Sequence, residues 1–91
     1  MTITYEDVVK AQQTQNKVIR KTNLEFSETF SKICGANVYL KNEYEQKTGS
    51  FKIRGAANTI LQLKKPELKE GIVTASSGNH GAAVSSIATK L

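Results

Sequence analysis

The sequence lacks the residues that crosslink small exported domains or build metal centres. It contains one cysteine, Cys34, and one histidine, His80. A single cysteine can form neither a disulfide nor a cysteine-based metal site within the chain, and this scarcity is typical of a reducing compartment. No group of His, Cys, Asp and Glu has the spacing of metal ligands. We therefore expect a cytoplasmic location and no metal site within these residues.

Long apolar runs and blocks of like charge are also missing. The N-terminus lacks the basic start and continuous apolar core of a signal peptide, and no run approaches the ~20 residues that span a membrane. The net charge is +5, but the Lys and Arg residues are scattered among Glu and Asp. This pattern favours a solvated surface, so we expect neither a nucleic-acid nor a membrane partner. A nucleic-acid binder remains an alternative that rests on net charge alone.

A chain of 91 residues can form at most one small domain with a modest core. Its apolar residues recur with clear helical and strand periods, which indicates a folded segment. Capping residues, turn glycines and Pro66 mark the boundaries of the elements. The predicted elements are helices at about 5–18, between Ser27 and Gly35, at 51–64 (ended by Pro66) and from 79 to the end of the chain, and strands at 38–43 and 72–75.

The order strand, helix, strand, helix predicts an α/β fold built on a right-handed parallel βαβ unit with flanking helices. In such sheets, ligands bind at the carboxyl ends of the strands. Two turns, at residues 48–56 and 76–81, follow the two predicted strands, and we expect them to form one site. The linker-like stretch 65–71 lies between the turns and predicts a domain boundary near residue 70.

The first turn places Lys52 at the expected start of a helix, just after a glycine-serine pair. A lysine amine is a nucleophile only when it is unprotonated, and a buried or electropositive setting permits it to attack an aldehyde. Phe51 could cover an aromatic ligand beside it. The alternative is an ordinary solvated lysine in a first helical turn. Arg54 could equally bind a carboxylate of the protein or touch a ligand.

The second turn combines backbone N–H groups at a helix start with small polar side chains. Such N–H groups and the helix dipole favour an anion such as a carboxylate. Gly78 permits close approach of the backbone, and Ser76, Ser77 and Asn79 add donors. The alternative is an ordinary Ser-Gly helix cap. His80 is more often structural than catalytic when it stands alone, and neither turn has a known phosphate-binding glycine pattern.

The two turns together resemble a known family. Residues 41–56 (KNEYEQKTGSFKIRGA) are similar to the lysine signature of pyridoxal-phosphate enzymes of the tryptophan synthase β-subunit fold type (fold type II). Residues 76–81 (SSGNHG) resemble the loop that binds the substrate carboxylate in the serine/threonine dehydratase and serine racemase branch. The resemblance covers nearly the whole chain, which corresponds to the N-terminal third or less of such an enzyme.

The resemblance implies a role for each residue of the two turns. Lys52 would hold pyridoxal 5'-phosphate covalently and remove the Cα proton of the substrate, while Phe51 lies against the cofactor ring. Asn79 would bond the phenolic oxygen of the cofactor. Ser77 is informative because racemases of the family use a serine there as acid and base on the opposite face, whereas many dehydratases have alanine. The implied carboxylate-binding residues are Ser76, Ser77, Gly78, Asn79 and His80.

The implied protein is a serine/threonine ammonia-lyase that converts L-threonine or L-serine to a 2-oxo acid and ammonia. A serine racemase, another lyase of hydroxy amino acids, or a non-catalytic module derived from the fold are alternatives. Residues 1–70 would belong to the large cofactor-binding domain and residues 71–91 to the small substrate-clamping domain of a homo-oligomer, a dimer or tetramer. The phosphate-binding loop, the partner of the pyridine nitrogen and any divalent-metal site would lie beyond Leu91, so we expect the isolated chain to be inactive.

Overall fold

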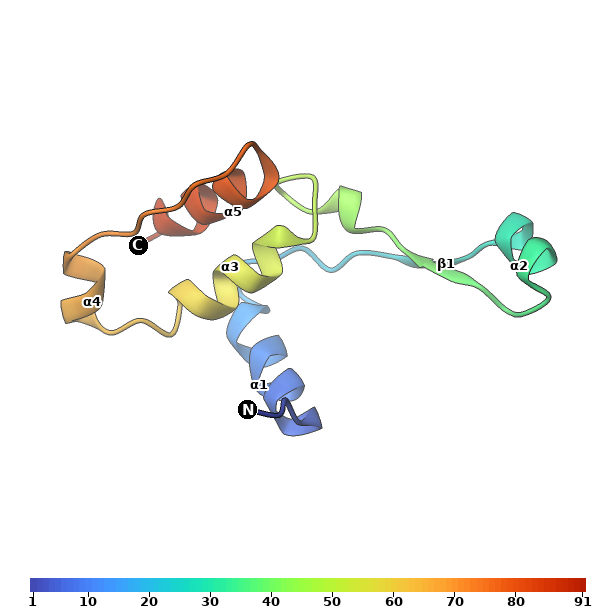
Figure 1. The fold of residues 1–91 in the computed structure, drawn as a ribbon, viewed down its shortest axis with the longest axis horizontal. Helices are drawn as coiled ribbons and strands as arrows, with labels where there is room; N and C mark the ends of the chain where they lie inside the picture. Colours follow the sequence, from blue (N-terminus) through green and yellow to red (C-terminus); the bar gives the residue numbers. More distant parts are fainter.

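The computed structural model describes all residues from 1 to 91. The chain forms helices, a short 3-10 helix and two strands (Figure 1). In chain order the elements are α1 (Tyr5–Gln15), β1 (Leu24–Phe26), α2 (Glu28–Cys34), β2 (Tyr39–Lys41), η1 (Glu43–Glu45), α3 (Lys52–Ile60), α4 (Lys65–Lys69) and α5 (Asn79–Ala88). None of the helices combines the length and the apolar character that crossing a membrane requires.

β1 and β2 form an antiparallel pair, and α2 lies in the connection between them; we call β1, α2 and β2 together the hairpin. Phe26 lies opposite Tyr39, and their rings make an edge-to-face contact with centroids 5.5 Å apart. α2 begins where the Ser27 hydroxyl accepts a backbone N–H bond of 3.2 Å. It ends before Gly35, whose φ of 65° suits glycine. The predicted helix between Ser27 and Gly35 and the strand within 38–43 are confirmed, whereas β1 is too short to give a recognisable alternation.

The hydrophobic core lies between α3 and α5, which pack side by side and begin at the same end of the pair (Figure 1). Alanines on both helices let the two backbones approach closely. α1 contacts α3, and half-buried side chains from the segment after α1, from the end of α3 and from α4 and the segment after it pack against the core. The buried apolar residues are Ile53, Ala56, Ala57 and Ile60 of α3 and Ala83, Val84 and Ile87 of α5. These buried positions recur at helical spacing, as expected for the helices predicted at 51–64 and from residue 79, although Leu91 at the end of the chain is 62% exposed.

The predicted strand at 72–75 is wrong, and so is its parallel pairing. These residues form no strand, and the side chain of Val73 is 98% exposed. The two-stranded sheet contains only β1 and β2, which run antiparallel. A strand needs a neighbour for its backbone N–H and C=O groups, and β2 uses β1 for this purpose. The apolar run at 72–75 therefore has no strand beside it in residues 1–91.

Three predicted helix ends also differ from the structure. α1 ends at Gln15 and α3 ends at Ile60, each a few residues earlier than expected. After α3 the chain tightens, because the N–H of Leu63 bonds the carbonyl of Ile60 at 3.1 Å instead of a residue four positions back. Pro66 lies in the first turn of α4, where a missing N–H is tolerated. α5 ends at Ala88 and a turn follows, so it does not continue to the end of the chain.

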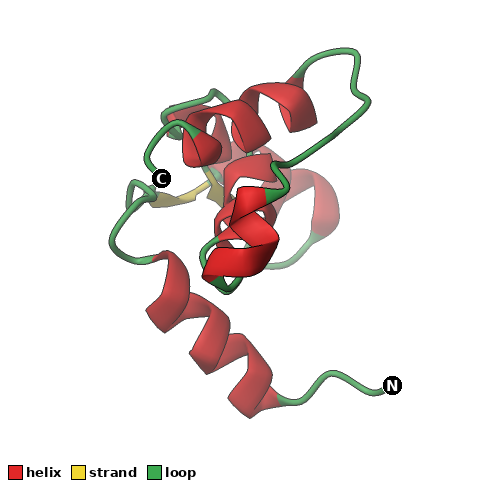
Figure 2. Cartoon of the chain, turned by 90° about the vertical axis from the view of Figure 1, so that its left-hand side faces the viewer, coloured by secondary structure: helices red, strands yellow, loops and turns green.

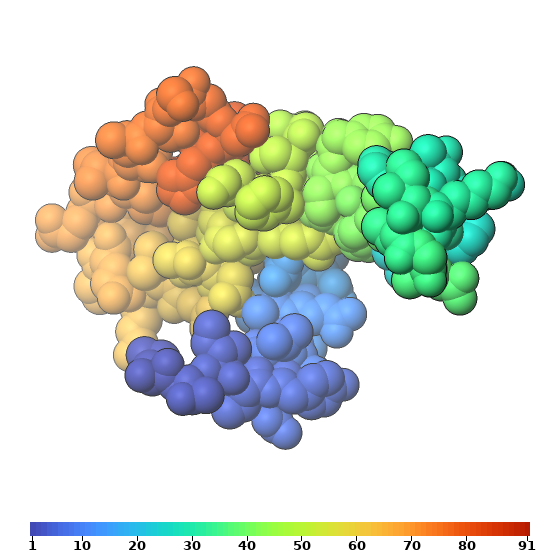
Figure 3. Space-filling view, turned by 45° about the vertical axis from the view of Figure 1, so that its right-hand side comes forward, coloured from blue at the N-terminus to red at the C-terminus, as the bar shows by residue number.

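The chain has an open shape. Figure 2 shows the N-terminal helix α1 extending away from the other helices, and Figure 3 shows α1 (blue) and the α2 end of the hairpin (green) as separate projections. The radius of gyration is 16.0 Å, against about 12 Å for a compact domain of this length. The stability of the fold therefore depends on the α3–α5 core and on the contacts that join α1 and the hairpin to this core.

The core generates a stability prediction. Ile53 and Ile87 are fully buried, so Ile53→Ala and Ile87→Ala should each lower the free energy of unfolding by about 2–5 kcal/mol. Ile33→Ala is the control, because that side chain is 74% exposed on α2, and its effect should stay within about 0.5 kcal/mol. Urea titrations followed by far-UV circular dichroism measure all three. Equal losses for the three variants would contradict the assignment of the core.

Candidate active site

Lys52 is the first residue of α3, as predicted, and a tight turn leads into it. Gly49 has a φ of 79°, which other residues rarely adopt, and its N–H donates to the carbonyl of Gln46 at 2.8 Å. The Ser50 hydroxyl then accepts the backbone N–H of Lys52 at 3.4 Å. The glycine-serine pair thus turns the chain and starts the helix at the lysine.

A cavity of about 580 Å³ adjoins this turn. Phe51 and Lys52 line it at the start of α3, and His80 lines it at the start of α5. The Lys52 Nζ lies 5.2 Å from the centroid of the Phe51 ring, a distance at which the ring face attracts a cation. The cavity therefore presents an amine and an aromatic face next to each other.

The start of α5 offers unpaired donors at the edge of this cavity. The backbone N–H groups of Asn79, His80 and Gly81 donate to no acceptor of the chain, so they are free to bind an anion. Gly78 precedes them, and its N–H is bonded to the hydroxyl of Ser76 at 3.1 Å. A Cβ at Gly81 would lie 3.3 Å from the Cβ of Ser76, so the glycine lets the loop pack against the helix.

The structure brings only some of the predicted site residues to one cavity. Phe51, Lys52 and His80 line it together, so the two predicted turns do meet. Residues 76–79 are exposed beside it and are not among its lining residues. Arg54 binds a carboxylate of the protein, which is one of its two expected roles, and it also lines the cavity.

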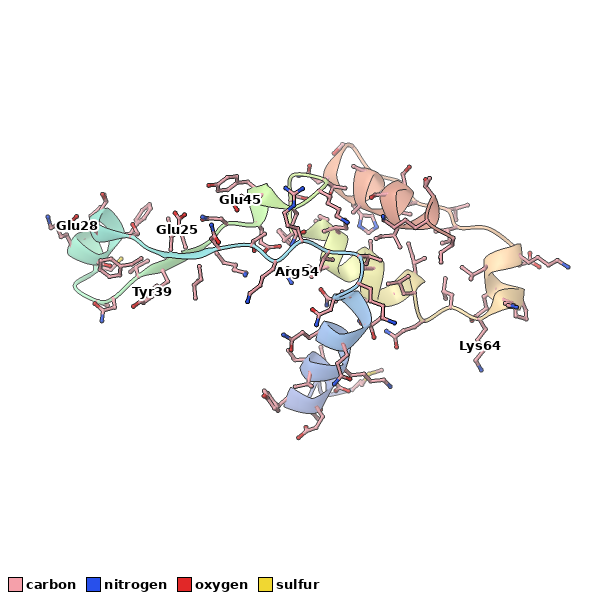
Figure 4. All side chains as sticks on the ribbon, turned by 180° about the vertical axis from the view of Figure 1, so that it is seen from behind. Glu25, Glu28, Tyr39, Glu45, Arg54 and Lys64 are labelled. Carbon is pink, nitrogen blue, oxygen red and sulfur yellow. The ribbon has the colours of Figure 1, made fainter.

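That carboxylate belongs to Glu43 of η1. The Nε and Nη2 atoms of Arg54 each lie 2.8 Å from an oxygen of Glu43, so the pair is bidentate. Figure 4 shows Arg54 near α1, α3 and the segment that joins α1 to β1, far from Glu28 at the other end of the hairpin. Bidentate Arg–carboxylate pairs fix geometry as well as adding attraction. The ion pair therefore ties α3 to the base of the hairpin.

Further polar groups surround this ion pair, and sequence reasoning missed them. The Thr22 hydroxyl donates to Glu43, and the side-chain amide of Gln46 donates to Glu43 at 3.3 Å. The same Gln46 bonds both backbone groups of Arg20, at 3.0 and 2.8 Å. Thr22 and Gln46 are buried. The spacing of Glu43 and Gln46, three residues apart in a helical turn, is the sequence signal that could have paired them.

The network lowers the pKa of Glu43 from its ordinary value of 4.5 to about 2. The hydrogen bonds of Arg54 are the largest cause, and those of Thr22 and Gln46 lower the pKa further, while partial burial opposes them. Glu43 in turn raises the pKa of the Arg54 guanidinium. Both side chains therefore stay charged at neutral pH, and the pair persists.

The residues at the cavity fit an aldehyde cofactor with an aromatic ring. Lys52 supplies a primary amine for the aldehyde, Phe51 supplies a flat apolar face, and the unpaired N–H groups of α5 suit a carboxylate. These are the groups that the sequence resemblance implies for pyridoxal phosphate and an amino-acid substrate. The amine, the aromatic ring and the N–H groups have the chemistry that such a cofactor and substrate need, and all of them lie at or beside one cavity.

Comparisons with known proteins agree with this chemistry. Residues 16–91 match the family model described as pyridoxal-phosphate dependent enzyme. The chain is 50% identical over 82 residues to the L-threonine ammonia-lyase of Thermotoga maritima, covering 90% of the chain and 20% of that enzyme. It is 46% identical over 84 residues to the serine racemase of Dictyostelium discoideum, covering 92% of the chain and 26% of that enzyme. The chain thus spans about a quarter or less of the length of these relatives.

A solved structure confirms the predicted fold class. The crystal structure of the serine racemase from Dictyostelium discoideum matches 93% of the chain and 28% of that protein, with 46% identity and a TM-score of 0.85. The chain therefore has the α/β fold of an N-terminal part of the fold-type II pyridoxal-phosphate enzymes. The expected boundary near residue 70 stays a prediction, and the α3–α5 core draws on residues from both sides of it.

The pKa of Glu43 generates a pH prediction. Because the folded value of about 2 lies below the ordinary value of 4.5, the unfolded chain takes up this proton first as the pH falls. The stabilisation by the charged pair is complete above about pH 4.5 and is lost as the pH falls toward 2. The difference in unfolding free energy between the parent and Glu43→Gln should therefore shrink in this window, as measured by urea titrations at stepped pH.

Glu28→Gln is the matched control for this measurement. Glu28 also forms an ion pair, with Lys32 at 3.0 Å, but both side chains are about three-quarters exposed. Exposed pairs contribute about 0–1 kcal/mol, so this variant should differ little from the parent at any pH. A Glu43→Gln difference that is the same at pH 3 and pH 7 would contradict the prediction.

Proposed function

Because the chain belongs to the family of pyridoxal-phosphate dependent enzymes, we propose that it is the lysine-bearing segment of a serine/threonine ammonia-lyase. The observation that carries the proposal is the cavity at which the Lys52 amine, the Phe51 ring and the start of α5 meet. The similarity to an L-threonine ammonia-lyase supports this substrate class. The proposed reaction converts L-threonine or L-serine to a 2-oxo acid and ammonia.

Lys52 is proposed to hold pyridoxal phosphate covalently through its amine and to take the Cα proton of the substrate as a general base. Bound pyridoxal phosphate supplies an electron sink for the charge left on Cα. Phe51 covers one face of the cofactor ring, and Asn79 hydrogen-bonds its phenolic oxygen. The place of Lys52 in the first turn of α3, where it lines the cavity beside Phe51, supports this assignment.

The turn before α5 is proposed to bind the substrate carboxylate. The free N–H groups of Asn79, His80 and Gly81 point to this role, since a helix start attracts a negative charge. Ser76, Gly78 and the side chains of Asn79 and His80 complete the group of carboxylate ligands. Holding the carboxylate fixes the Cα–H bond beside the Lys52 amine, which is the orientation that proton abstraction needs.

Serine racemase is the second candidate function, and Ser77 is the observation that favours it. Its side chain is exposed in the loop next to the cavity, and a hydroxyl there could give or take a proton on the face opposite Lys52. The similarity to the Dictyostelium discoideum serine racemase supports this reading. Proton return from Ser77 would invert Cα, whereas loss of the β-hydroxyl as water would give a 2-aminoacrylate product, which water then hydrolyses to the 2-oxo acid and ammonia.

The remaining features of the whole protein are also proposals. Residues 1–70 belong to the larger domain and residues 71–91 to a smaller one that clamps the substrate, and the protein is a cytoplasmic homo-oligomer. Residues 1–91 alone are proposed to be inactive. The amine of Lys52 and the turn before α5 are open to water in this segment, while chemistry of this kind depends on a site that excludes water.

A lysine replacement tests the cofactor assignment. In the protein expressed from its complete gene, Lys52→Ala should abolish the visible absorbance band that borohydride removes, because the amine that carries the cofactor is gone. Lys47→Ala is the control, since Lys47 is exposed in the same loop and should leave the band unchanged. A borohydride-sensitive band that persists in Lys52→Ala would mean that another residue binds the cofactor.

A serine replacement separates the two candidate activities. The complete protein is incubated with L-serine, and pyruvate and D-serine are both assayed. If the protein racemises, Ser77→Ala should lower D-serine formation by about 10²–10⁴-fold, the usual contribution of an acid–base group, and should spare pyruvate. Ser85→Ala, an exposed position on α5, is the control. D-serine formation that survives in Ser77→Ala would rule out the role given to Ser77.

A further inference from the structure

Glu43 contacts residues on both sides of the loop that carries Lys52. We call residues 47–53 the lysine loop; they comprise the turn and the first two residues of α3. Gln46 precedes it and donates to the Oε2 atom of Glu43 at 3.3 Å. Arg54 follows it and donates to both oxygens of Glu43 at 2.8 Å. One carboxylate therefore closes the lysine loop at its two ends.

The closed loop is also fixed to the rest of the chain. Gln46 is 4% exposed and bonds the N–H and the carbonyl of Arg20 through its side chain. The carbonyl of Gln46 accepts the N–H of Gly49 inside the lysine loop. The Arg20 guanidinium donates to the carbonyl of Glu45 at 3.0 Å. The end of the loop that precedes the glycine turn is therefore held by several bonds to Gln46 and by one to the neighbouring Glu45.

Lys52 itself has little else to hold it. Its amine forms no hydrogen bond or ion pair within the chain, and its residue is exposed. The backbone bond to Ser50 is long, at 3.4 Å. The placement of the amine therefore depends on how the two ends of the lysine loop are held, and Glu43 contacts a residue at each end.

We propose that Glu43 is a positioning residue for Lys52, which it holds at the cavity by closing the lysine loop through Gln46 and Arg54. The inference rests on the proposed cofactor role of Lys52, although the closure of the loop does not. Glu43 neither touches the amine nor lines the cavity itself, and it reaches the cavity only through Arg54, which is one of the lining residues. Its effect on Lys52 therefore passes through the residues on either side of the lysine. Because the Nε and Nη2 atoms of Arg54 are bonded to Glu43, the start of α5 offers the unpaired donors for the carboxylate of a ligand.

The test compares two measurements in the protein expressed from its complete gene. Amide hydrogen exchange reports the order of residues 47–53 without any cofactor. Borohydride reduction with pyridoxal phosphate, followed by peptide mass spectrometry, reports the concentration of cofactor that half-modifies Lys52. The variants are Glu43→Gln, which keeps the shape but removes the charge, and Arg54→Lys, which keeps the charge but removes the two-pronged contact. Glu28→Gln is the control for loss of an exposed ion pair.

Exchange in the lysine loop should rise roughly tenfold in Glu43→Gln and Arg54→Lys, since hydrogen bonds to charged groups are lost. The amides of α3 after Arg54 and the amides of α5 should change much less. This difference separates a local effect on the lysine loop from a general loss of stability. The cofactor concentration that half-modifies Lys52 should rise by a similar factor, and Glu28→Gln should match the parent in both measurements. Exchange that rises equally throughout α3 and α5, or a lysine loop that behaves as in Glu28→Gln, would overturn the proposal.

The two proposals fail in different ways. If the parent protein carries no cofactor on Lys52, the proposed function is wrong, while the exchange measurement still decides whether Glu43 orders the loop. If the parent carries the cofactor and Glu43→Gln retains both the order of the loop and the half-modification concentration, only the positioning role is wrong.

Discussion

The ion pair between Glu43 and Arg54 is the contact on which the arrangement of the chain depends. It joins α3, which belongs to the core, to η1 at the base of the hairpin. Thr22 and Gln46 bind the same carboxylate and bring in the segment that follows α1. The chain is open, and its projections share little apolar contact. A few directional polar bonds therefore hold the projections in place, as the burial of apolar side chains would in a protein with a larger core.

α3 is held by both apolar and polar contacts, and the two kinds have different roles. Along its length it buries Ile53, Ala56, Ala57 and Ile60 against α5, and this packing sets how the two helices lie together. Packing between apolar faces is non-directional, whereas a hydrogen-bonded ion pair fixes an orientation. The bidentate contact of Arg54 supplies direction at the first turn of the helix. The cavity lies where the apolar packing of α3 against α5 and the ion pair of Arg54 adjoin, since Arg54, Ala56 and Val84 all line it.

The sequence predicts well what is encoded locally. Ser27 and Gly35 mark the ends of α2, the apolar spacing of α3 and α5 identifies the core, and the turn at Lys52 has the expected start. It predicts poorly what depends on distant partners. Residues 72–75 have the composition of a buried strand, but a strand exists only beside another strand. The bonds from Gln46 to Arg20 join positions far apart in the chain, so no local pattern reveals them.

The place of the lysine loop, between the hairpin and the core, has a consequence for the order of folding. Its two ends are held only when the hairpin base and α3 are both in place. The hairpin pairs residues that are nearer in sequence than those joined in the α3–α5 core, so we expect it to form earlier. The loop is therefore among the last parts to become ordered. While a folding chain has formed only the hairpin or only the α3–α5 core, we expect Lys52 to remain mobile. The amine then takes its place at the cavity only after both parts have folded.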